Sequence, residues 1–152
     1  MRPNWKQFII CQAVPIILAL LAMAASLCVK ATYTWLFLFA CNLLTVFLLW
    51  QLTVFYKIRY VITEEQLIYV HGVLLQMTDY MELYRVVDYQ QHQTLLQQLM
   101  GLKTVIVYSG DRNTNVLVLV GIPKRRDIVA EIRNRVERNK KGKGVYEITN
   151  RY

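Results

Sequence analysis

The sequence predicts an α+β membrane protein in which a two-helix transmembrane hairpin precedes an antiparallel β-barrel or split sheet closed by a C-terminal α-helix. Two long uncharged runs, residues 8–29 and 31–56, predict the hairpin. Short Val-rich runs separated by polar turns predict the strands, and an amphipathic segment near the end predicts the last helix. The expected division is a hairpin over residues 1–56, a globular domain over 57–139 and a basic flexible tail over 140–152.

Each uncharged run is long enough to cross a bilayer. The first has twenty-two residues, and a helix of that length extends about 33 Å, close to the ~30 Å hydrocarbon core. Only a short segment around Lys30 separates the two runs, so they should form a tight antiparallel hairpin. Pro15 lies inside the first run and should kink it, because proline removes a backbone donor.

The charges that flank the runs predict their orientation. Arg2 and Lys6 precede the first run and Lys57 and Arg59 follow the second, whereas Lys30 stands alone between them. The positive-inside rule therefore places both termini in the cytoplasm. A cleaved signal peptide is the alternative, because a basic start, an apolar run and small residues at 22–25 imitate its three regions. The length of the first run favours an anchor.

The polar residues of the hairpin are few, and neither run contains Asp, Glu, Lys, Arg or His. Counted from the turn, Asn42 lies about as deep as Ala22, and Ser26 is another small residue nearby. Asn42, Ala22 and Ser26 are therefore candidate helix–helix contacts, since small residues allow close approach and an amide can bond across helices. Asn42 facing a partner subunit remains the alternative.

The strands come next and have hairpin spacing. "KIRYVIT" and "LIYVHGVLL" surround one polar turn, and "KTVIVYSG" and "NVLVLVGI" surround another, which predicts a locally connected antiparallel sheet. After Pro123, the apolar residues Ile128, Val129, Ile132 and Val136 share one face of a helix that should end at about Asn139.

The segment "ELYRVVDYQQHQTLLQQLMG", residues 82–101, connects the two strand groups. Leu83, Val86 and Val87 suit a bent or bulged strand. Residues 94–100 suit a helical turn that ends at Gly101, with leucines that cap one end of the sheet. Its glutamines are interpreted as solvated surface, with a docking surface as the alternative: Gln90, Gln91, Gln93, Gln97 and Gln98.

Three longer stretches carry a family resemblance: "YVITEEQLIYVHGVL", "MELYRVVDYQQHQTLLQQLMGLKTVIVYSG" and "LVLVGIPKRRDIVAEI". In order and spacing they resemble the membrane-anchored bacterial pleckstrin-homology-like (PH-like) domains, in the subgroup with an N-terminal transmembrane hairpin. The matching positions are Tyr60 to Thr63, Gly72, Arg85 to Asp88, Leu95 to Gly101, and Gly121 with Ile122. Glu82 stands where that family usually has proline.

The resemblance covers residues 57 to about 138 and implies a bacterial inner-membrane protein with two roughly orthogonal sheets and a C-terminal helix. Such a fold is a binding scaffold that hosts many ligands, so function has to be argued from the surface. Phosphoinositide-binding relatives use Lys and Arg between the first two strands. Here that turn contains Glu64 and Glu65, which should repel a phosphorylated headgroup.

The positive charge is concentrated near the C-terminus. Residues 57–111 hold four Lys or Arg against six Asp or Glu, whereas residues 112–152 hold eleven against four. This basic segment is a candidate membrane-surface or partner-binding site; a solvated helix face with a flexible tail is the alternative. Nucleic acid is disfavoured, because no aromatics interleave with the charges. The candidates are Lys124, Arg125, Arg126, Arg133, Lys140, Lys141 and Lys143.

The inventory of catalytic residue types is thin. His71 and His92 are the only histidines, no phosphate-binding glycine loop is present, and no cofactor or metal is expected. Arg85 and Asp88 are expected to form a local structural pair, with a partner-binding role as the alternative. The predicted function is a non-enzymatic adaptor or scaffold that binds membrane lipids or a protein partner. The alternatives are a small integral subunit that oligomerises within a larger membrane complex, and an enzyme of membrane lipids, which no feature favours.

Overall fold

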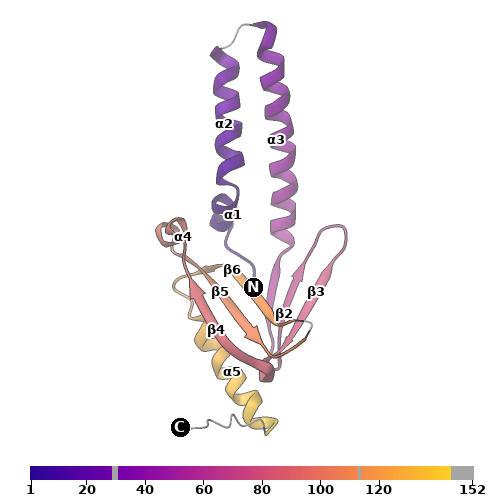
Figure 1. The fold of residues 1–152 in the computed structure, drawn as a ribbon, viewed down its shortest axis with the longest axis vertical. Helices are drawn as coiled ribbons and strands as arrows, with labels where there is room; N and C mark the ends of the chain where they lie inside the picture. The colour runs from indigo at the N-terminus through magenta and orange to yellow at the C-terminus, as the bar shows by residue number, and fades with distance from the viewer. Residues whose placement is uncertain (29–30, 113, 145–152) are drawn as a thin grey trace.

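The computed structural model describes residues 1–28, 31–112 and 114–144. Lys30 and the terminal segment 145–152, which carries most of the predicted flexible tail, lie outside the described residues. Two long helices stand side by side on one end of a β-domain, and the last helix runs towards the opposite end (Figure 1). The chain is therefore a mixed α+β protein with a helical hairpin, two sheets and a C-terminal helix.

The first predicted span is bent, as Pro15 requires. α1 (Trp5–Cys11) and α2 (Ala13–Cys28) meet at an angle of 67°. Pro15 has no N–H to donate to the carbonyl of Cys11, four residues earlier, and its ring crowds that carbonyl, so the helical ladder breaks there. α3 (Ala31–Lys57) is long and apolar enough to cross a membrane over Tyr33–Lys57, and the bent pair would qualify as a second span.

The hairpin contact follows one seam on α3. Half-buried residues recur there at alternating spacings of three and four: Thr34, Phe37, Cys41, Leu44 and Leu48. The Cys41 thiol donates to the carbonyl of Ala19 on α2 at 3.6 Å. Ser26 is buried and Ala22 half-buried, whereas Asn42 is exposed. Asn42 does not face α2, contrary to the first expectation, because one residue turns a helix by about 100° and so moves it off the seam.

The domain contains two three-stranded antiparallel sheets. One is formed by β1 (Arg59–Ile62), β2 (Gln66–His71) and β3 (Met77–Glu82). The other is formed by β4 (Val86–His92), β5 (Leu102–Ser109) and β6 (Val116–Pro123). Each sheet connects strands that are neighbours in sequence. The predicted antiparallel, locally connected topology is thus confirmed.

The sheets are split and do not close into a barrel. Within the described residues β1 and β6 share no ladder, and the N-terminal segment lies beside both edges instead. The Tyr60 N–H donates to the Met1 carbonyl at 2.7 Å, and the Asn4 N–H donates to the Gly121 carbonyl at 3.0 Å. These bonds occupy backbone groups on the edge strands β1 and β6, which would bond to each other in a closed barrel.

The core lies between the sheets and α5 (Ile128–Gly142). Its most deeply buried side chains are apolar and come from every layer: Leu67, Met81, Leu83, Val105, Val107, Leu119, Ile122, Ile128 and Ile132. The predicted helix face is confirmed, with Ile128, Ile132 and Val136 buried. The helix ends at Gly142 and not at about Asn139, so Lys140 and Lys141 lie in its last turn, where positive charge suits the helix dipole.

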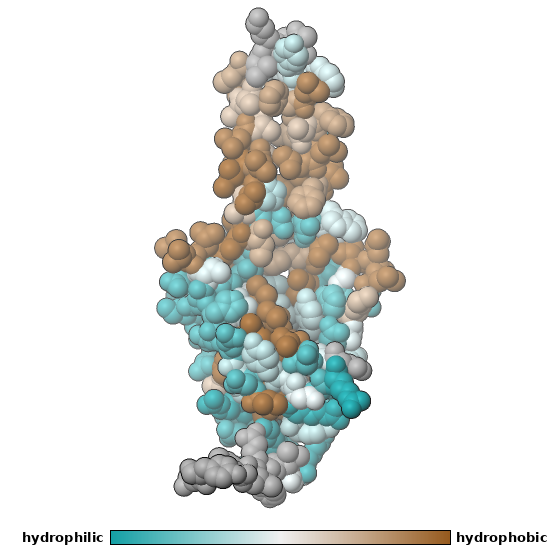
Figure 2. Space-filling model, viewed as in Figure 1, coloured by the Kyte–Doolittle hydropathy of each residue, from teal (hydrophilic) through white to brown (hydrophobic). Residues whose placement is uncertain are grey.

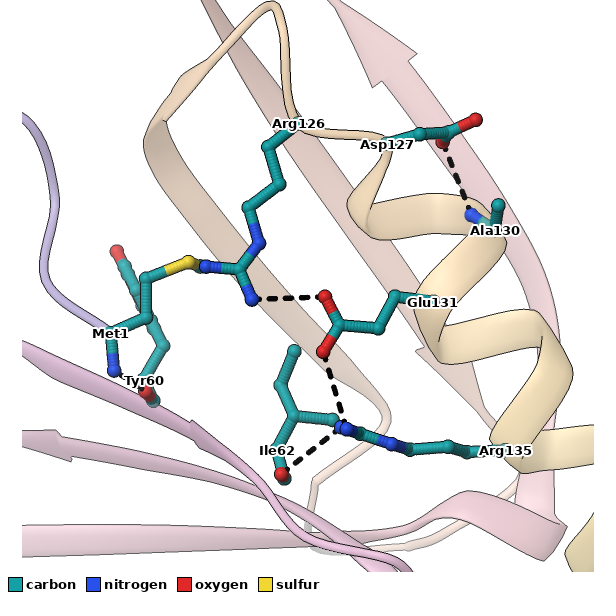
Figure 3. A network of polar contacts seen from close by, with 8 residues as sticks. All are labelled: Met1, Tyr60, Ile62, Arg126, Asp127, Ala130, Glu131 and Arg135. Atoms are coloured by element: carbon teal, nitrogen blue, oxygen red, sulfur yellow. Dashed lines mark hydrogen bonds and ion pairs between the residues drawn. The ribbon is translucent and has the colours of Figure 1, made fainter.

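A polar network fastens α5 to the first sheet (Figure 3). The Asp127 carboxylate caps the helix by accepting from the Ala130 N–H at 3.2 Å. Glu131 pairs with Arg126 at 2.9 Å and with Arg135 at 3.3 Å, and Arg135 donates to the Ile62 carbonyl at 3.1 Å. Arg126 is therefore engaged within the domain and is less available to an outside partner.

The backbone of the segment that connects the two sheets agrees with the sequence prediction. η1 (Leu83–Arg85) is a 3-10 turn, and β4 has an irregular register between Val86 and Asp88, which confirms the expected bulge. α4 (Leu95–Met100) has a Thr94–Gln97 capping box and ends at Gly101, whose φ is +67°. The predicted helical turn is therefore confirmed.

The side chains of this connection depart from expectation. Leu95, Leu96 and Leu99 are exposed and do not cap the sheet, whereas Gln97 is buried and not solvated. The Gln97 side chain points inwards because its amide donates to two buried acceptors, Gln7 Oε1 and Thr104 Oγ1. Gln90, Gln91 and Gln98 are exposed as predicted.

The predicted local pair between Arg85 and Asp88 is also wrong. Arg85 pairs with Asp111 at 3.3 Å, and the Asp88 carboxylate accepts from the Tyr89 N–H at 2.7 Å. Arg85 lies in the 3-10 turn η1, before β4 begins. Its side chain reaches Asp111, in the chain that follows β5.

Candidate functional site

A cleft of about 370 Å³ opens between the foot of the helical hairpin and the two sheets. Its lining is mostly apolar, with a few polar side chains, as is typical of sites that take small or extended ligands. Helices α1 and α3 contribute Gln7, Cys11 and Phe55, the first sheet contributes Tyr60, Tyr69 and Asp79, and the second sheet contributes Val116, Leu117, Val118 and Val120. The cleft is thus shared between hairpin and domain.

Aromatic rings form one wall of this cleft. Tyr60 stands opposite Tyr69 in the β1–β2 ladder, and their rings stack with centroids 5.4 Å apart. Tyr69 stacks in turn on His71, two residues along the same strand face, at 4.6 Å. The Tyr60 hydroxyl accepts from the Val120 N–H at 3.2 Å and so links the two sheets. Of these three rings, Tyr60 and Tyr69 line the cleft.

Polar groups lie in and beside this wall: Tyr60 and Asp79 line the cleft, and His71 lies next to it, stacked on Tyr69. Burial raises the pKa of Tyr60 to about 12, and the hydrogen bond from Val120 opposes that shift only in part. His71 Nδ1 is buried without a hydrogen-bond partner among the described residues, and Asp79 Oδ2 lies 3.7 Å from it, too far for a good hydrogen bond. Among the described lining residues, Asp79 is the one with a charged side chain.

Gln7, which lines the cleft, also belongs to a buried junction between α1 and the domain. The buried Gln97 amide donates to Gln7 Oε1 and to Thr104 Oγ1, each at 2.9 Å. Gly121 has φ +72°, and a Cβ there would lie 2.8 Å from the Cβ of Gln7. The hairpin therefore rests directly on the domain and is not joined to it by a loose tether.

Sequence reasoning missed both the junction and the cleft. Gln7 and Gln97 are two of many polar residues, and the only local signal was Gly121, a glycine inside a Val-rich strand pattern. Tyr60 and Tyr69 looked like ordinary strand residues. Their placement at partner positions across a predicted hairpin was the available signal for an aromatic pair.

The predicted basic site is divided by the fold. Lys124 and Arg125 lie with Asn4 and Lys6 around one recess beside α1 and the end of α4. Lys140, Lys141 and Lys143 lie at the end of α5, on the side of the domain away from the hairpin (Figure 1). Lys143 places its ammonium 4.1 Å from the ring centre of Tyr84. Arg126 is paired with Glu131, and Arg133 is exposed along α5.

The acidic β1–β2 turn shares the distal end of the domain with the last turn of α5. Glu64 and Glu65 line a shallow groove there with Arg138 and Lys143. The Asn139 amide donates to the Glu64 carbonyl and closes one side of this groove. The turn and its carboxylates therefore lie far from the foot of the hairpin (Figure 1).

Two split three-stranded sheets, a closing C-terminal helix and a ligand-sized cleft define a small α+β domain built as a binding scaffold. The chain belongs to the bacterial PH domain family, whose model matches residues 9–136. That match takes in the helical hairpin as well as both sheets and most of α5. No curated protein and no solved structure matches the chain.

Proposed function

We propose that the protein is a membrane-anchored binding module of the bacterial inner membrane. In this proposal the hairpin crosses the bilayer twice, both termini are cytoplasmic, and the PH domain binds a protein or lipid partner at the cytoplasmic face. Binding is the role that the family and its scaffold fold support in general. The module would act as an adaptor that holds its partner at the membrane surface.

One observation carries this proposal: the cleft opens at the foot of the hairpin and is lined by both parts of the chain. Phe55 and Ile58 come from the end of α3 and its exit, and Tyr60 and Val118 come from the two sheets. A ligand in the cleft would therefore touch the anchor and the domain together. An apolar lining at this level suits an acyl chain or an apolar side chain of a membrane-bound partner.

The residues at the two ends of α3 support the orientation. Tyr33 and Trp35 are exposed near its start, and Trp50 and Tyr56 are exposed near its end. Exposed Trp and Tyr in two belts are typical of the two membrane–water interfaces. Lys57 ends the helix on the side of the domain, where cytoplasmic positive charge is expected.

Site-specific photo-crosslinking in intact membranes tests the site. A photoreactive residue replaces Val118, which lines the cleft and is 39% exposed, or Val87, an exposed valine of β4 that serves as the matched control. We expect a defined protein or lipid adduct from position 118 and none from position 87. Equal adducts from both positions, or none from 118, would contradict the cleft as the binding site.

A second candidate, an oligomeric membrane subunit, is favoured by the exposure of Asn42 on α3. An amide that faces lipid lacks hydrogen-bond partners, and a second copy would supply them. Thr45 is the matched control, because its hydroxyl donates to the Cys41 carbonyl of its own helix at 2.8 Å. Under this candidate Asn42→Leu reduces the particle size in mild detergent and Thr45→Val does not. An unchanged size in Asn42→Leu would remove it.

A further inference from the structure

We propose that two apolar projections beside the hairpin insert into the headgroup layer of the leaflet that faces the domain, and so fix its orientation on the bilayer. The α4 projection consists of Leu95, Leu96 and Leu99. The turn projection consists of Leu74 and Leu75, between β2 and β3, and of Met77, the first residue of β3. This inference rests on the proposed membrane anchoring and adds a second mode of contact to it.

Both projections expose large apolar side chains to an unusual extent. Leu99 and Leu74 are each 84% exposed, and Leu95 and Leu75 are 78% and 76% exposed. Single exposed leucines are common on soluble domains, but adjacent ones that form a patch mark a site of interaction. Each projection presents three exposed apolar residues within a segment of at most five residues.

The local structure holds these leucines outwards. In α4 the capping box and the buried Gln97 commit the opposite side of the helix to the domain. In the turn projection Gly72 has φ +98°, and a Cβ there would overlap the carbonyl oxygen of Leu75. Only glycine fits this tight turn, which leaves Leu74 and Leu75 at its tip. The exposure is therefore a fixed feature of the fold.

The positions of the two projections identify the occupant as a bilayer. They lie on opposite sides of the foot of the hairpin, at the level of α1 (Figure 1). In the same view apolar surface appears on both sides below the hairpin, and most of the domain beneath it is hydrophilic apart from a central strip (Figure 2). A protein docked on one side of the hairpin would cover only one projection. The surface of a bilayer crossed by the hairpin lies perpendicular to the hairpin axis and so contacts both projections.

The charges at this end of the domain fit the same plane. Lys57 ends α3, Arg59 begins β1, and Lys6, Lys124 and Arg125 lie around the recess beside α1. Lys and Arg near a leaflet surface attract anionic headgroups while neighbouring Leu and Trp side chains enter the interface. Trp5 of α1 is 60% exposed and belongs to the same level. The membrane-facing end thus combines apolar projections with basic residues.

Depth measurements on single nitroxide labels test this inference in the full chain. The native cysteines Cys11, Cys28 and Cys41 are replaced by serine, and the protein is reconstituted in vesicles of phosphatidylethanolamine and phosphatidylglycerol. Labels are attached in four variants: Leu74→Cys, Leu99→Cys, Leu43→Cys and Val87→Cys. Leu43 lies mid-way along α3 and reports anchoring, and Val87 is the exposed apolar control on β4. Collision rates with membrane-soluble oxygen and with a water-soluble nickel chelate are compared.

We expect the ratio of oxygen to chelate collisions to be highest at position 43, intermediate at positions 74 and 99, and lowest at position 87. If positions 74 and 99 behave like position 87 while position 43 stays lipid-exposed, the projections are in water and the inference is wrong although anchoring stands. If neither reagent reaches positions 74 and 99, a protein covers them and the bilayer is not their occupant. If position 43 also collides with the chelate, the hairpin is not in the bilayer and the proposed function fails with the inference.

Discussion

The side-chain amide of Gln97 lies 2.9 Å from Oε1 of Gln7, ninety positions earlier in the chain, inside a buried junction between α4 and α1. The same amide reaches Thr104 on β5. The hairpin and the domain are therefore joined by hydrogen bonds shielded from water, as well as by the peptide link between α3 and β1. Such a joint transmits the orientation of the hairpin to the domain.

Replacement of Gln97 by alanine should weaken this joint. Gln7 and Thr104 would each lose a buried partner, and an unsatisfied buried polar group costs about 1–3 kcal/mol. We expect Gln97→Ala to lower the free energy of unfolding by about that amount in denaturant titrations in detergent. Gln98→Ala, in the same helix but exposed, should change it by less than about 0.5 kcal/mol. Equal effects of the two variants would contradict a buried junction.

Replacement of Gly121 by alanine should disturb the same joint from the side of β6. Its φ of +72° is unfavourable for alanine, and the added Cβ would lie 2.8 Å from Gln7 Cβ. We expect a loss of stability of about 1–3 kcal/mol, measured as before. Gly142→Ala is the control, because nothing lies within 4 Å of a Cβ there and the residue is helical. A harmless Gly121→Ala variant would mean that α1 does not pack on β6.

Alanine substitutions at two leucines compare the effect of a buried core position with that of an exposed surface position. Leu119 is fully buried between the sheets, whereas Leu99 is exposed on α4. Leu119→Ala should cost about 2–5 kcal/mol of unfolding free energy, because it leaves a cavity. Leu99→Ala should cost less than about 0.5 kcal/mol in detergent. A large cost at Leu99 would restore the interpretation in which the α4 leucines cap the sheet.

Stability should fall at alkaline pH in a way that depends on Tyr60. Burial raises the pKa of its hydroxyl to about 12 from 10.0, so the contribution is complete below about pH 10. Between about pH 10 and about pH 12 the unfolded chain ionises Tyr60 while the folded chain keeps it neutral, and the free energy of unfolding decreases by up to about 2 kcal/mol. Denaturant titrations at several pH values measure this slope.

Tyr60→Phe should flatten that alkaline decrease, because no hydroxyl remains to ionise. Tyr80→Phe is the control, since Tyr80 is 54% exposed on β3. An alkaline slope that persists unchanged in Tyr60→Phe would show that other groups cause it. Tyr89 is the next candidate, because burial also raises its pKa to about 12.

Backbone features were predictable from local sequence because local forces dictate them. Pro15 breaks the first helix, Thr94 and Gln97 cap α4, and Gly101 ends it, each through bonds within four or five residues. The pairing of β1 with β2 and of β5 with β6 followed from alternating apolar residues and polar turns, whereas β3 was not predicted as a strand. The direction of side chains was less predictable. The α4 leucines and Asn42 were placed inwards by pattern, and both are exposed.

The sequence by itself determined the helical hairpin, the antiparallel pairing of neighbouring strands and the apolar face of α5, since these depend on periodicity and turn chemistry. Only the tertiary structure decided that the sheets stay split, that Gln97 faces inwards, and that the basic residues separate into two groups at opposite ends of the domain. The reason is physical: contacts between Met1 and Tyr60 or between Gln7 and Gln97 join residues far apart in the chain, and no local pattern encodes them.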